Sequence, residues 1–183
     1  MERSTQTMTI PAAEPACQST GMETLLAYQE TVFLICLGFT HNQWDAQELA
    51  QETYLRAQKR IHQLRQPEAA KAWICCLARN LCLDHLRTLR WRRFLGLEEA
   101  GERSHNQNPE ILLVTEEKIR VVQNAIAQLP RKLREVFILR AYGELSYEEI
   151  SATLALNPGT VMSRLSRARA VVKQAVVEGG FHE

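Results

Sequence analysis

The sequence has few of the residues that interrupt helices, with 8 glycines and 6 prolines among 183 residues. No stretch alternates apolar and polar residues as a half-buried strand does, which argues against a sheet-based fold. The longest apolar run, residues 32–38, is far shorter than the roughly 20 residues that cross a bilayer. Because 45% of the residues are hydrophobic, the chain can still bury a core. We therefore expect an all-α protein of one domain or two small ones.

The five cysteines do not form the pattern of a disulfide framework, because their number is odd and no secretory signal precedes them. Reduced thiols in the cytoplasm are the expectation. A metal site or a cysteine enzyme could be proposed from four residues, Cys75, Cys76, Cys82 and His85. However, the chain has no paired C-x-x-C motif, no evident fourth ligand, no well-placed orienting acid and no oxyanion-hole signature. We expect no metal, no cofactor, no catalytic residue and no small-molecule substrate.

The formal net charge of +1 conceals a segregation of charge along the chain. Residues 85–93 carry four arginines and no acid, whereas residues 45–52 are acidic. Opposite charges on separate segments indicate more than one kind of partner.

Residues 146–173 have the pattern of two short helices joined by a tight turn. Ser146 and Glu149 form an S-x-x-E capping box at the start of the first helix. In the turn, Asn157 can cap the second helix and Pro158 suits its first position, where no amide donor is needed. This arrangement predicts a helix-turn-helix.

The second of these helices separates an apolar stripe from a small, polar and cationic face, and residues 158–173 contain no acid. At about 100° per residue, Val161, Leu165, Ala168 and Val172 form the stripe, Ser163, Ser166, Arg167 and Ala170 point the opposite way, and Thr160, Arg164 and Lys173 lie on the flanks. Such a helix suits a DNA major groove, where arginines reach phosphates or guanine edges. Taken alone, the pattern also fits an ordinary amphipathic surface helix.

Two further helices are predicted in the front half of the chain. The first begins at Asp45 and Glu48 with a D-x-x-E signal and extends to about Leu64. Its apolar side leaves out Glu48, Gln51, Glu52 and Tyr54. These residues form either a solvated face or an acidic docking face for a basic partner helix, and composition favours the solvated face.

The second helix follows the break at Pro67 and continues to about Arg93. Its apolar stripe comprises Trp73, Leu77, Leu81 and Asp84, whereas Arg79, Asn80 and Arg87 lie elsewhere. It ends in a basic cluster with a tryptophan, a pattern that suits a nucleic-acid backbone with occasional base stacking. Basic residues also favour a helix C-terminus electrostatically, so the pattern is not specific to nucleic acid.

The rest of the chain supplies tails, a linker and the support of the helix-turn-helix. One helix from about Glu117 ends at Pro130, and a further helix is closed by Gly143. The predicted organisation is a flexible tail (1–21), a first helical domain (22–94), a flexible linker (95–117), a second helical domain (118–177) and a C-terminal tail (178–183).

Two long motifs resemble those of bacterial RNA polymerase sigma factors of the extracytoplasmic function (ECF) type. The first is DAQELAQETYLRAQKRI followed by AWICCLARNLCLDHLR, which is similar to sigma region two. The second is LPRKLREVFILRAYGELSYEEISATLALNPGTVMSRLSRAR, which is similar to sigma region four. The two motifs occur in the family's order and separation, and the resemblance covers about residues 22–177.

The resemblance implies a role for each group of residues. Glu48, Gln51, Glu52 and Tyr54 match positions that dock on the clamp helices of the polymerase β′ subunit. Arg79, Asn80, Asp84 and Arg87, with the loop 63–70, match the part that opens and reads the −10 element. Met162, Ser163, Ser166 and Arg167, with Thr160 beside them, match the face toward the −35 element, and Arg164 and Arg169 either contact phosphate or brace the domain.

The chain departs from the family pattern at Ala70, where an aromatic residue is frequent, and at Met162, where a basic one is frequent. Cys75, Cys76 and Cys82 are not part of that pattern either. The implied function is an alternative sigma factor, not an enzyme, that binds polymerase core through β′ and β. The implied regulator is an anti-sigma protein, often held at the membrane. The alternative is a helix-turn-helix repressor or activator whose front half is a ligand-binding or dimerisation domain.

Overall fold

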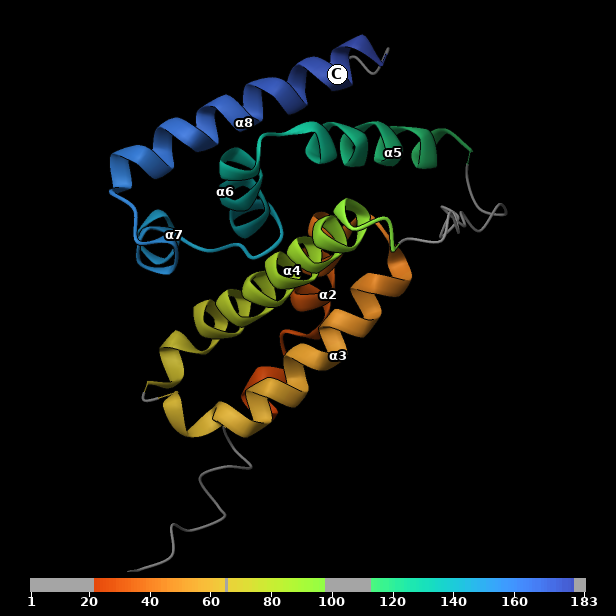
Figure 1. Ribbon diagram of the computed structural model, residues 1–183. Helices are drawn as coiled ribbons and strands as arrows, with labels where there is room; N and C mark the ends of the chain where they lie inside the picture. Colours follow the sequence, from red (N-terminus) through yellow and green to blue (C-terminus); the bar gives the residue numbers. More distant parts are fainter. Residues whose placement is uncertain (1–21, 65, 98–112, 180–183) are drawn as a thin grey trace, which may run out of the picture.

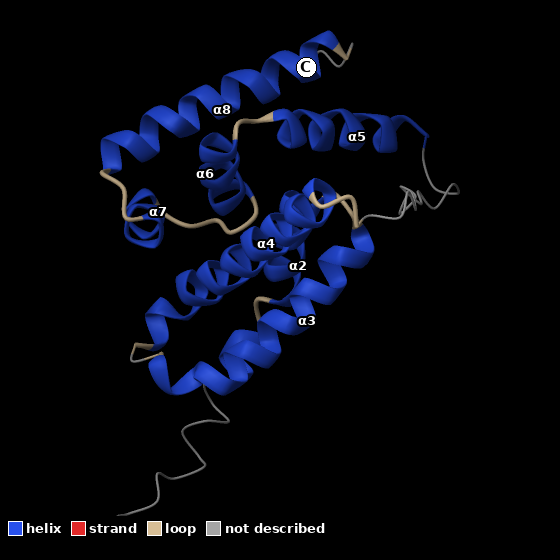
Figure 2. Ribbon diagram, viewed as in Figure 1, coloured by secondary structure: helices blue, strands red, loops and turns tan. Residues whose placement is uncertain are grey.

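The computed structural model describes residues 22–64, 66–97 and 113–179 (Figure 1). Over these residues the regular structure is helical and no strand occurs (Figure 2), so the predicted all-α fold class is confirmed. The predicted N-terminal tail, most of the predicted linker and the last four residues lie outside the described ranges. None of the described helices is both long enough and apolar enough to cross a membrane.

The first group of helices consists of α2 (Gln29–Thr40), α3 (Gln43–Arg60) and α4 (Ala70–Phe94), which pack on one another. Two short 3-10 turns, η1 (Ile61–Gln63) and η2 (Pro67–Ala69), lie between α3 and α4. Residues 22–26 are also helical, and a turn at residues 27–28 separates them from α2. Buried side chains from all three helices make the core of this group, among them Ile35, Phe39, Leu49, Ile74 and Leu81.

The second group consists of α5 (Leu113–Gln128), α6 (Arg131–Ala141), α7 (Tyr147–Leu154) and α8 (Pro158–Glu178). Helix α8 packs on the other three, and α5 begins inside the range expected as linker. The guanidinium of Arg134 fastens α6 to the end of α5 by donating to the carbonyl oxygens of Ala127 and Leu129. Burial of this group lowers the pKa of Arg134.

Side-chain caps determine where several helices start. The capping box before α7 is confirmed, because Oγ of Ser146 accepts from the N–H of Glu149 at 3.1 Å and Oε2 of Glu149 accepts from the N–H of Ser146 at 2.7 Å. The predicted cap of α8 is also confirmed, with Oδ1 of Asn157 accepting from the N–H of Gly159 at 2.9 Å. These short-range bonds satisfy amides that have no partner within their helix.

The predicted start of α3 is wrong. Oδ1 of Asn42 accepts from the N–H groups of Trp44 and Asp45, so the helix begins at Gln43. His41 ends α2 in the left-handed conformation, with a φ of 55°, and leaves only a short connection in which Asn42 is the first available cap. Asp45 is therefore buried within the first turn of α3.

The glycine after α6 serves for close packing. A Cβ on Gly143 would lie 2.6 Å from the carbonyl oxygen of Leu139, so no side chain fits there. The left-handed residue of this turn is Glu144, with a φ of 50°. The expectation that Gly143 closes α6 was right about the position, but the reason is space and not a positive φ.

The two groups of helices lie against each other (Figure 1). Helix α2 contacts α5 and α6, and α4 contacts α7. As a result, helices that the two sequence motifs place far apart in the chain share an interface.

Candidate nucleic-acid interface

Helix α8 presents the polar face that the sequence predicted. Val161, Leu165 and Ala168 are buried, whereas Ser163, Ser166 and Arg167 are exposed. Met162 also lies outward, with 55% of its surface exposed, and Arg169 is exposed, whereas Thr160 and Arg164 are half-buried. The stripe is thus confirmed, and the free face consists of short polar side chains and arginines that can approach a phosphate backbone or base edges.

Helix α3 exposes an acidic stripe that also contains large apolar side chains. Glu48 and Gln51 are exposed, and Glu52 is half-buried and accepts from Nε of Arg56 at 2.7 Å. Trp44 and Leu55 extend the same stripe and are 71% and 54% exposed. Sequence reasoning missed both, although spacings of four, three and four residues from 44 through 48 and 51 to 55 place them on one side of a helix.

Tyr54 does not share this acidic stripe. Its side chain is half-buried, and its hydroxyl donates to the carbonyl oxygen of Leu25 at 3.2 Å. Burial, with smaller contributions from Cys75 and Cys36, raises the pKa of Tyr54 to about 12. The structure therefore places the hydroxyl toward the preceding segment of the chain.

Helix α4 carries a second polar stripe. Asn80, Asp84 and Arg87 are exposed at spacings of four and three residues, and Nη1 of Arg87 donates to Oδ1 of Asp84 at 3.2 Å. The prediction that Asp84 belongs to the apolar stripe is wrong, because the buried face turns toward Ala78, Leu81 and Cys82. These three exposed residues can face a nucleic acid together.

Arg79 differs from the other predicted −10 residues because it faces α6. Its Nε donates to Oε2 of Glu135 at 3.1 Å, its Nη2 contacts the same oxygen, and its Nη1 donates to Oδ1 of Asn80 at 2.8 Å. Oε1 of Glu135 also accepts from Nε of Arg131 at 2.7 Å. The side chains of Arg79 and Glu135 are only 16% and 10% exposed, so this is a largely buried ion pair between the two groups of helices.

Comparison with known proteins relates each of the two groups of helices to a conserved region of sigma factors. Residues 25–92 match the family model described as sigma-70 region 2, and residues 119–171 match sigma-70 region 4. The chain is 32% identical over 162 residues to the RNA polymerase sigma-H factor of Pseudomonas aeruginosa, with 83% of each chain covered. It is 31% identical over 142 residues to the ECF RNA polymerase sigma-E factor of Escherichia coli, covering 74% of that protein. The chain belongs to the ECF type of RNA polymerase sigma factors.

One similar protein is much longer than this sigma factor. A probable RNA polymerase sigma factor of Xanthomonas campestris pv. campestris, RfaY, is 31% identical over 175 residues, but the chain spans only 43% of its length.

Two solved structures share the fold. RpoE of Bartonella quintana, in complex with the anti-sigma factor NepR, has a TM-score of 0.66 at 22% identity and covers 89% of this chain and 98% of its own. CnrH, in complex with the cytosolic domain of CnrY, has a TM-score of 0.65 at 19% identity and covers 88% of this chain and 90% of its own.

We name residues 25–92 of this sigma factor the region-two module and residues 119–171 the region-four module. A cavity of about 430 Å³ lies where the two modules meet and is lined by five arginines, Arg56, Arg60, Arg79, Arg87 and Arg131. Asp84 also lines this cavity, beside the arginines. Four of these arginines are already paired with acids: Arg56 with Glu52, Arg79 and Arg131 with Glu135, and Arg87 with Asp84.

The cysteines of the sigma factor are mostly buried thiols. Burial is the largest cause that raises the pKa of Cys75, to about 12. Hydrogen bonding with the Cys36 thiol, followed by burial, raises the pKa of Cys82. His85 lies 3.7 Å from Asp45, too far for a hydrogen bond. Within the described ranges, no three His, Cys, Asp or Glu side chains are grouped as metal ligands.

Proposed function

We propose that this sigma factor binds RNA polymerase core and directs initiation at promoters that it reads with both modules. The observation that carries the proposal is the acidic stripe of α3, which shares a module with the polar stripe of α4. A helix-turn-helix repressor has no need for a protein-docking stripe beside a DNA-opening helix. Catalysis belongs to the polymerase, and the sigma factor is not itself an enzyme and acts in the cytoplasm, where the polymerase works.

In this proposal α3 docks on the clamp helices of β′ through Glu48, Gln51 and Glu52. The exposed Leu55 and Trp44 supply apolar contact area around the charges. Acidic groups orient a basic partner helix, whereas apolar side chains removed from water contribute most of the affinity. Tyr54 supports this helix from the side, because its hydroxyl is bonded to Leu25.

We further propose that α4 opens and reads the −10 element with Arg79, Asn80, Asp84 and Arg87. A base can be captured most easily from a strand that is already open, because unstacking costs a few kcal/mol. The −35 element faces α8, whose Met162, Ser163, Ser166 and Arg167 are all exposed. Thr160, Arg164 and Arg169 flank this face and would contact phosphates.

Transcription with purified polymerase core tests the function directly. The sigma factor is added to core on a library of genomic fragments, and the start sites of the runoff products are mapped. We expect products that begin a fixed distance downstream of shared −35 and −10 sequences. Binding to duplex DNA without any effect of added core would support the helix-turn-helix repressor instead.

An anti-sigma partner is the second part of the proposal. Two of the similar solved structures are complexes, one with an anti-sigma factor and one with the cytosolic domain of another protein. We propose that a partner, held at the membrane, covers the surfaces used for core and DNA and so lowers the active fraction by mass action. Co-purification from native cells followed by competition with core tests this. A ternary complex that still initiates transcription would contradict it.

A further inference from the structure

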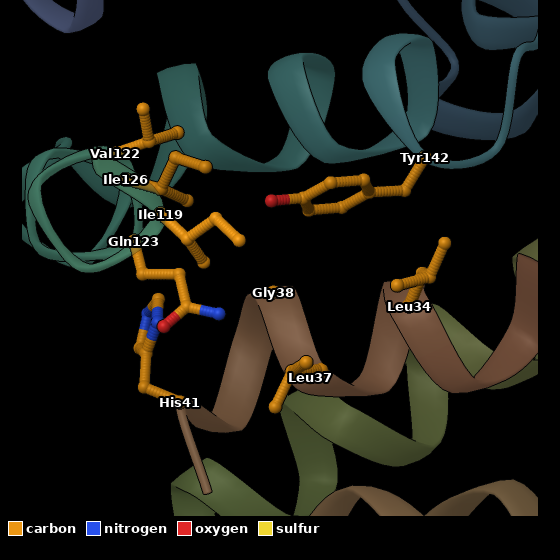
Figure 3. Close-up of a pocket in the computed structure, with 9 residues that line it drawn as sticks. All are labelled: Leu34, Leu37, Gly38, His41, Ile119, Val122, Gln123, Ile126 and Tyr142. Carbon is orange, nitrogen blue, oxygen red and sulfur yellow. The ribbon is translucent and has the colours of Figure 1, made fainter. Parts of the chain in front are cut away.

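Helices α2 and α5, which belong to different modules, leave a space between them. A cavity of about 430 Å³ lies there (Figure 3), with Leu34 and Leu37 of α2 on one side and Val122 and Ile126 of α5 on the other. A single water takes up only about 30 Å³, whereas ligand pockets in proteins measure about 300–1,000 Å³. The cavity is therefore large enough for a small organic molecule.

The wall of this cavity is mostly apolar. Gly38 and Ile119 add to the four aliphatic side chains, and among the described residues that line the cavity none is Asp, Glu, Lys or Arg. A charged molecule would lose its hydration there without gaining a partner of opposite charge, which is unfavourable. The lining thus selects an uncharged and mainly apolar molecule.

A few polar side chains give this wall a limited capacity for hydrogen bonds. The Tyr142 ring lies over Gly38, and Figure 3 shows its hydroxyl directed toward the side chains of α5. Gln123 and His41 also line the cavity and lie away from that ring (Figure 3). A tyrosine hydroxyl both donates and accepts. Because polar groups on an apolar wall fix the orientation of a ligand, one hydroxyl group on the ligand is enough to use Tyr142.

The cavity can be reached from solvent along α5. Ile119, at its rim, is 52% exposed, whereas Ile126, two turns further along the same helix, is 1% exposed. The cavity therefore has an open end and a closed end. A small molecule can enter it without unfolding either module.

We propose that this cavity binds an uncharged, mainly apolar small molecule whose single hydroxyl group pairs with the hydroxyl of Tyr142. The bound molecule contacts both modules, so it stabilises the arrangement in which they touch, because a ligand favours the form that binds it. None of the residues that the proposed function assigns to polymerase core or to DNA lines the cavity. The proposal therefore goes beyond that function and does not rest on it.

Three related compounds test the chemistry of the site on the full-length protein. The probe is 2-naphthol, which has two fused apolar rings and one hydroxyl, and naphthalene lacks only the hydroxyl. Equilibrium dialysis should show one saturable site for 2-naphthol, and about fivefold weaker binding of naphthalene, as expected for the loss of one neutral hydrogen bond. The charged analogue 2-naphthalenesulfonate should not bind. Absence of saturable binding by 2-naphthol, or equal binding of the sulfonate, would overturn the proposal.

A cavity-filling substitution locates the site. V122F places a ring in the space and should lower the affinity for 2-naphthol at least about tenfold. V171F makes the same substitution at a residue of α8 that is 45% exposed and does not line the cavity, and it should leave the affinity unchanged. Equal affinities of V122F and V171F, with folding verified by circular dichroism, would show that the probe binds elsewhere and would overturn the site.

The hydrogen bond is tested by a variant that keeps the shape of the wall. Y142F removes only the hydroxyl and should lower the affinity for 2-naphthol about fivefold while leaving that for naphthalene unchanged. An equal change for both compounds would overturn the pairing with Tyr142. This variant does not depend on whether V122F folds.

Hydrogen–deuterium exchange of the full-length chain tests whether the molecule bridges the modules. Saturating 2-naphthol should slow amide exchange in peptides from both α2 and α5, and V122F should show neither effect. Protection confined to one of the two helices would overturn the bridging. Failure of the proposed function has a separate signature, since promoter-directed transcription with purified core would then be missing whether or not 2-naphthol binds.

Discussion

The Tyr142 ring, directly after the end of α6, packs against Gly38, where α2 presents no side chain of its own. A Cβ on Gly38 would lie 2.8 Å from Cε2 and 3.1 Å from Cδ2 of Tyr142, and 3.2 Å from Cδ1 of Ile138. The glycine is therefore required by close approach, within a helix whose interior it otherwise weakens. Burial in this contact raises the pKa of Tyr142.

The first prediction is that G38A separates the two modules without weakening α2. Alanine favours the helix by roughly 0.5–1 kcal/mol, whereas overpacking against Tyr142 costs about 1–3 kcal/mol. A carbodiimide cross-link between Lys71 of α4 and Glu144 after α6, whose Nζ and Oε2 lie 2.7 Å apart, should fall in yield while the thermal midpoint does not. The control is Y142A, because in that background the added methyl group has room and should change the yield little. A lower thermal midpoint together with a full cross-link yield would contradict the prediction.

Local signals were sufficient for the helix-turn-helix but not for α3. Ser146 with Glu149, and Asn157, act on amides within three residues, so their sequence pattern already determines the bond. Asp45 carries a similar signal, yet Asn42 lies closer to the end of α2 and takes the cap. Competition between neighbouring caps depends on where the preceding helix stops.

Contacts between the modules could not be predicted from the motifs. Arg79 and Glu135 are 56 residues apart. The sequence shows that both are charged and lie in helices, but it does not show that they form a pair. The motif assigned Arg79 to DNA, whereas the fold brings it to α6. Trp44 and Leu55 could have been predicted, because their helical spacing with Glu48 and Gln51 is visible in the sequence.

The second prediction concerns docking on polymerase core. E52K should weaken core binding strongly, because reversed charge at a complementary interface costs several kcal/mol. Folding should change by less than about 0.5 kcal/mol, since only the partly exposed i,i+4 pair with Arg56 is lost. E30K, on the exposed side of α2, is the control with the same charge change. Equal pull-down of core by E52K and E30K would refute the docking surface.

The third prediction extends this surface to its apolar part. L55A should lower the affinity for core, because 54% of the Leu55 surface is free to be buried by a partner. Full burial of a leucine is worth about 1.5–3 kcal/mol, and about half of that surface is still free on Leu55, so the loss should be about 1–1.5 kcal/mol, roughly fivefold to tenfold in affinity. L26A, at a residue that is 42% exposed outside α3, should leave core binding unchanged. Titration of core by fluorescence anisotropy would detect the difference, and equal losses in both variants would argue against a specific contact.

The fourth prediction concerns the −35 face. R167A should reduce transcription from −35-dependent promoters, and if Arg167 reads a guanine the loss is about 1–3 kcal/mol and specificity relaxes at one base pair. K173A, at an exposed residue six positions further along α8, should have a smaller effect. Runoff transcription from single-base variants of one promoter measures both. A uniform loss over all promoter variants would indicate that Arg167 contacts a phosphate. Normal transcription from every variant would show that Arg167 is not part of the −35 interface.

The last prediction concerns the thiols and their pH dependence. The thiolate is the reactive form, and burial raises the pKa of Cys75 to about 12, so Cys75 should stay protonated at pH 9 in the folded chain. Because the unfolded chain gives up this proton near pH 9, the contribution of Cys75 to stability is present below that value and falls as the pH rises toward 12. Iodoacetamide at pH 9 should modify the partly exposed Cys76 but spare Cys36, Cys75 and Cys82 unless urea is added. Transcription should survive this alkylation, whereas modification of Cys75 in the folded protein, with loss of activity, would restore the case for a functional thiol.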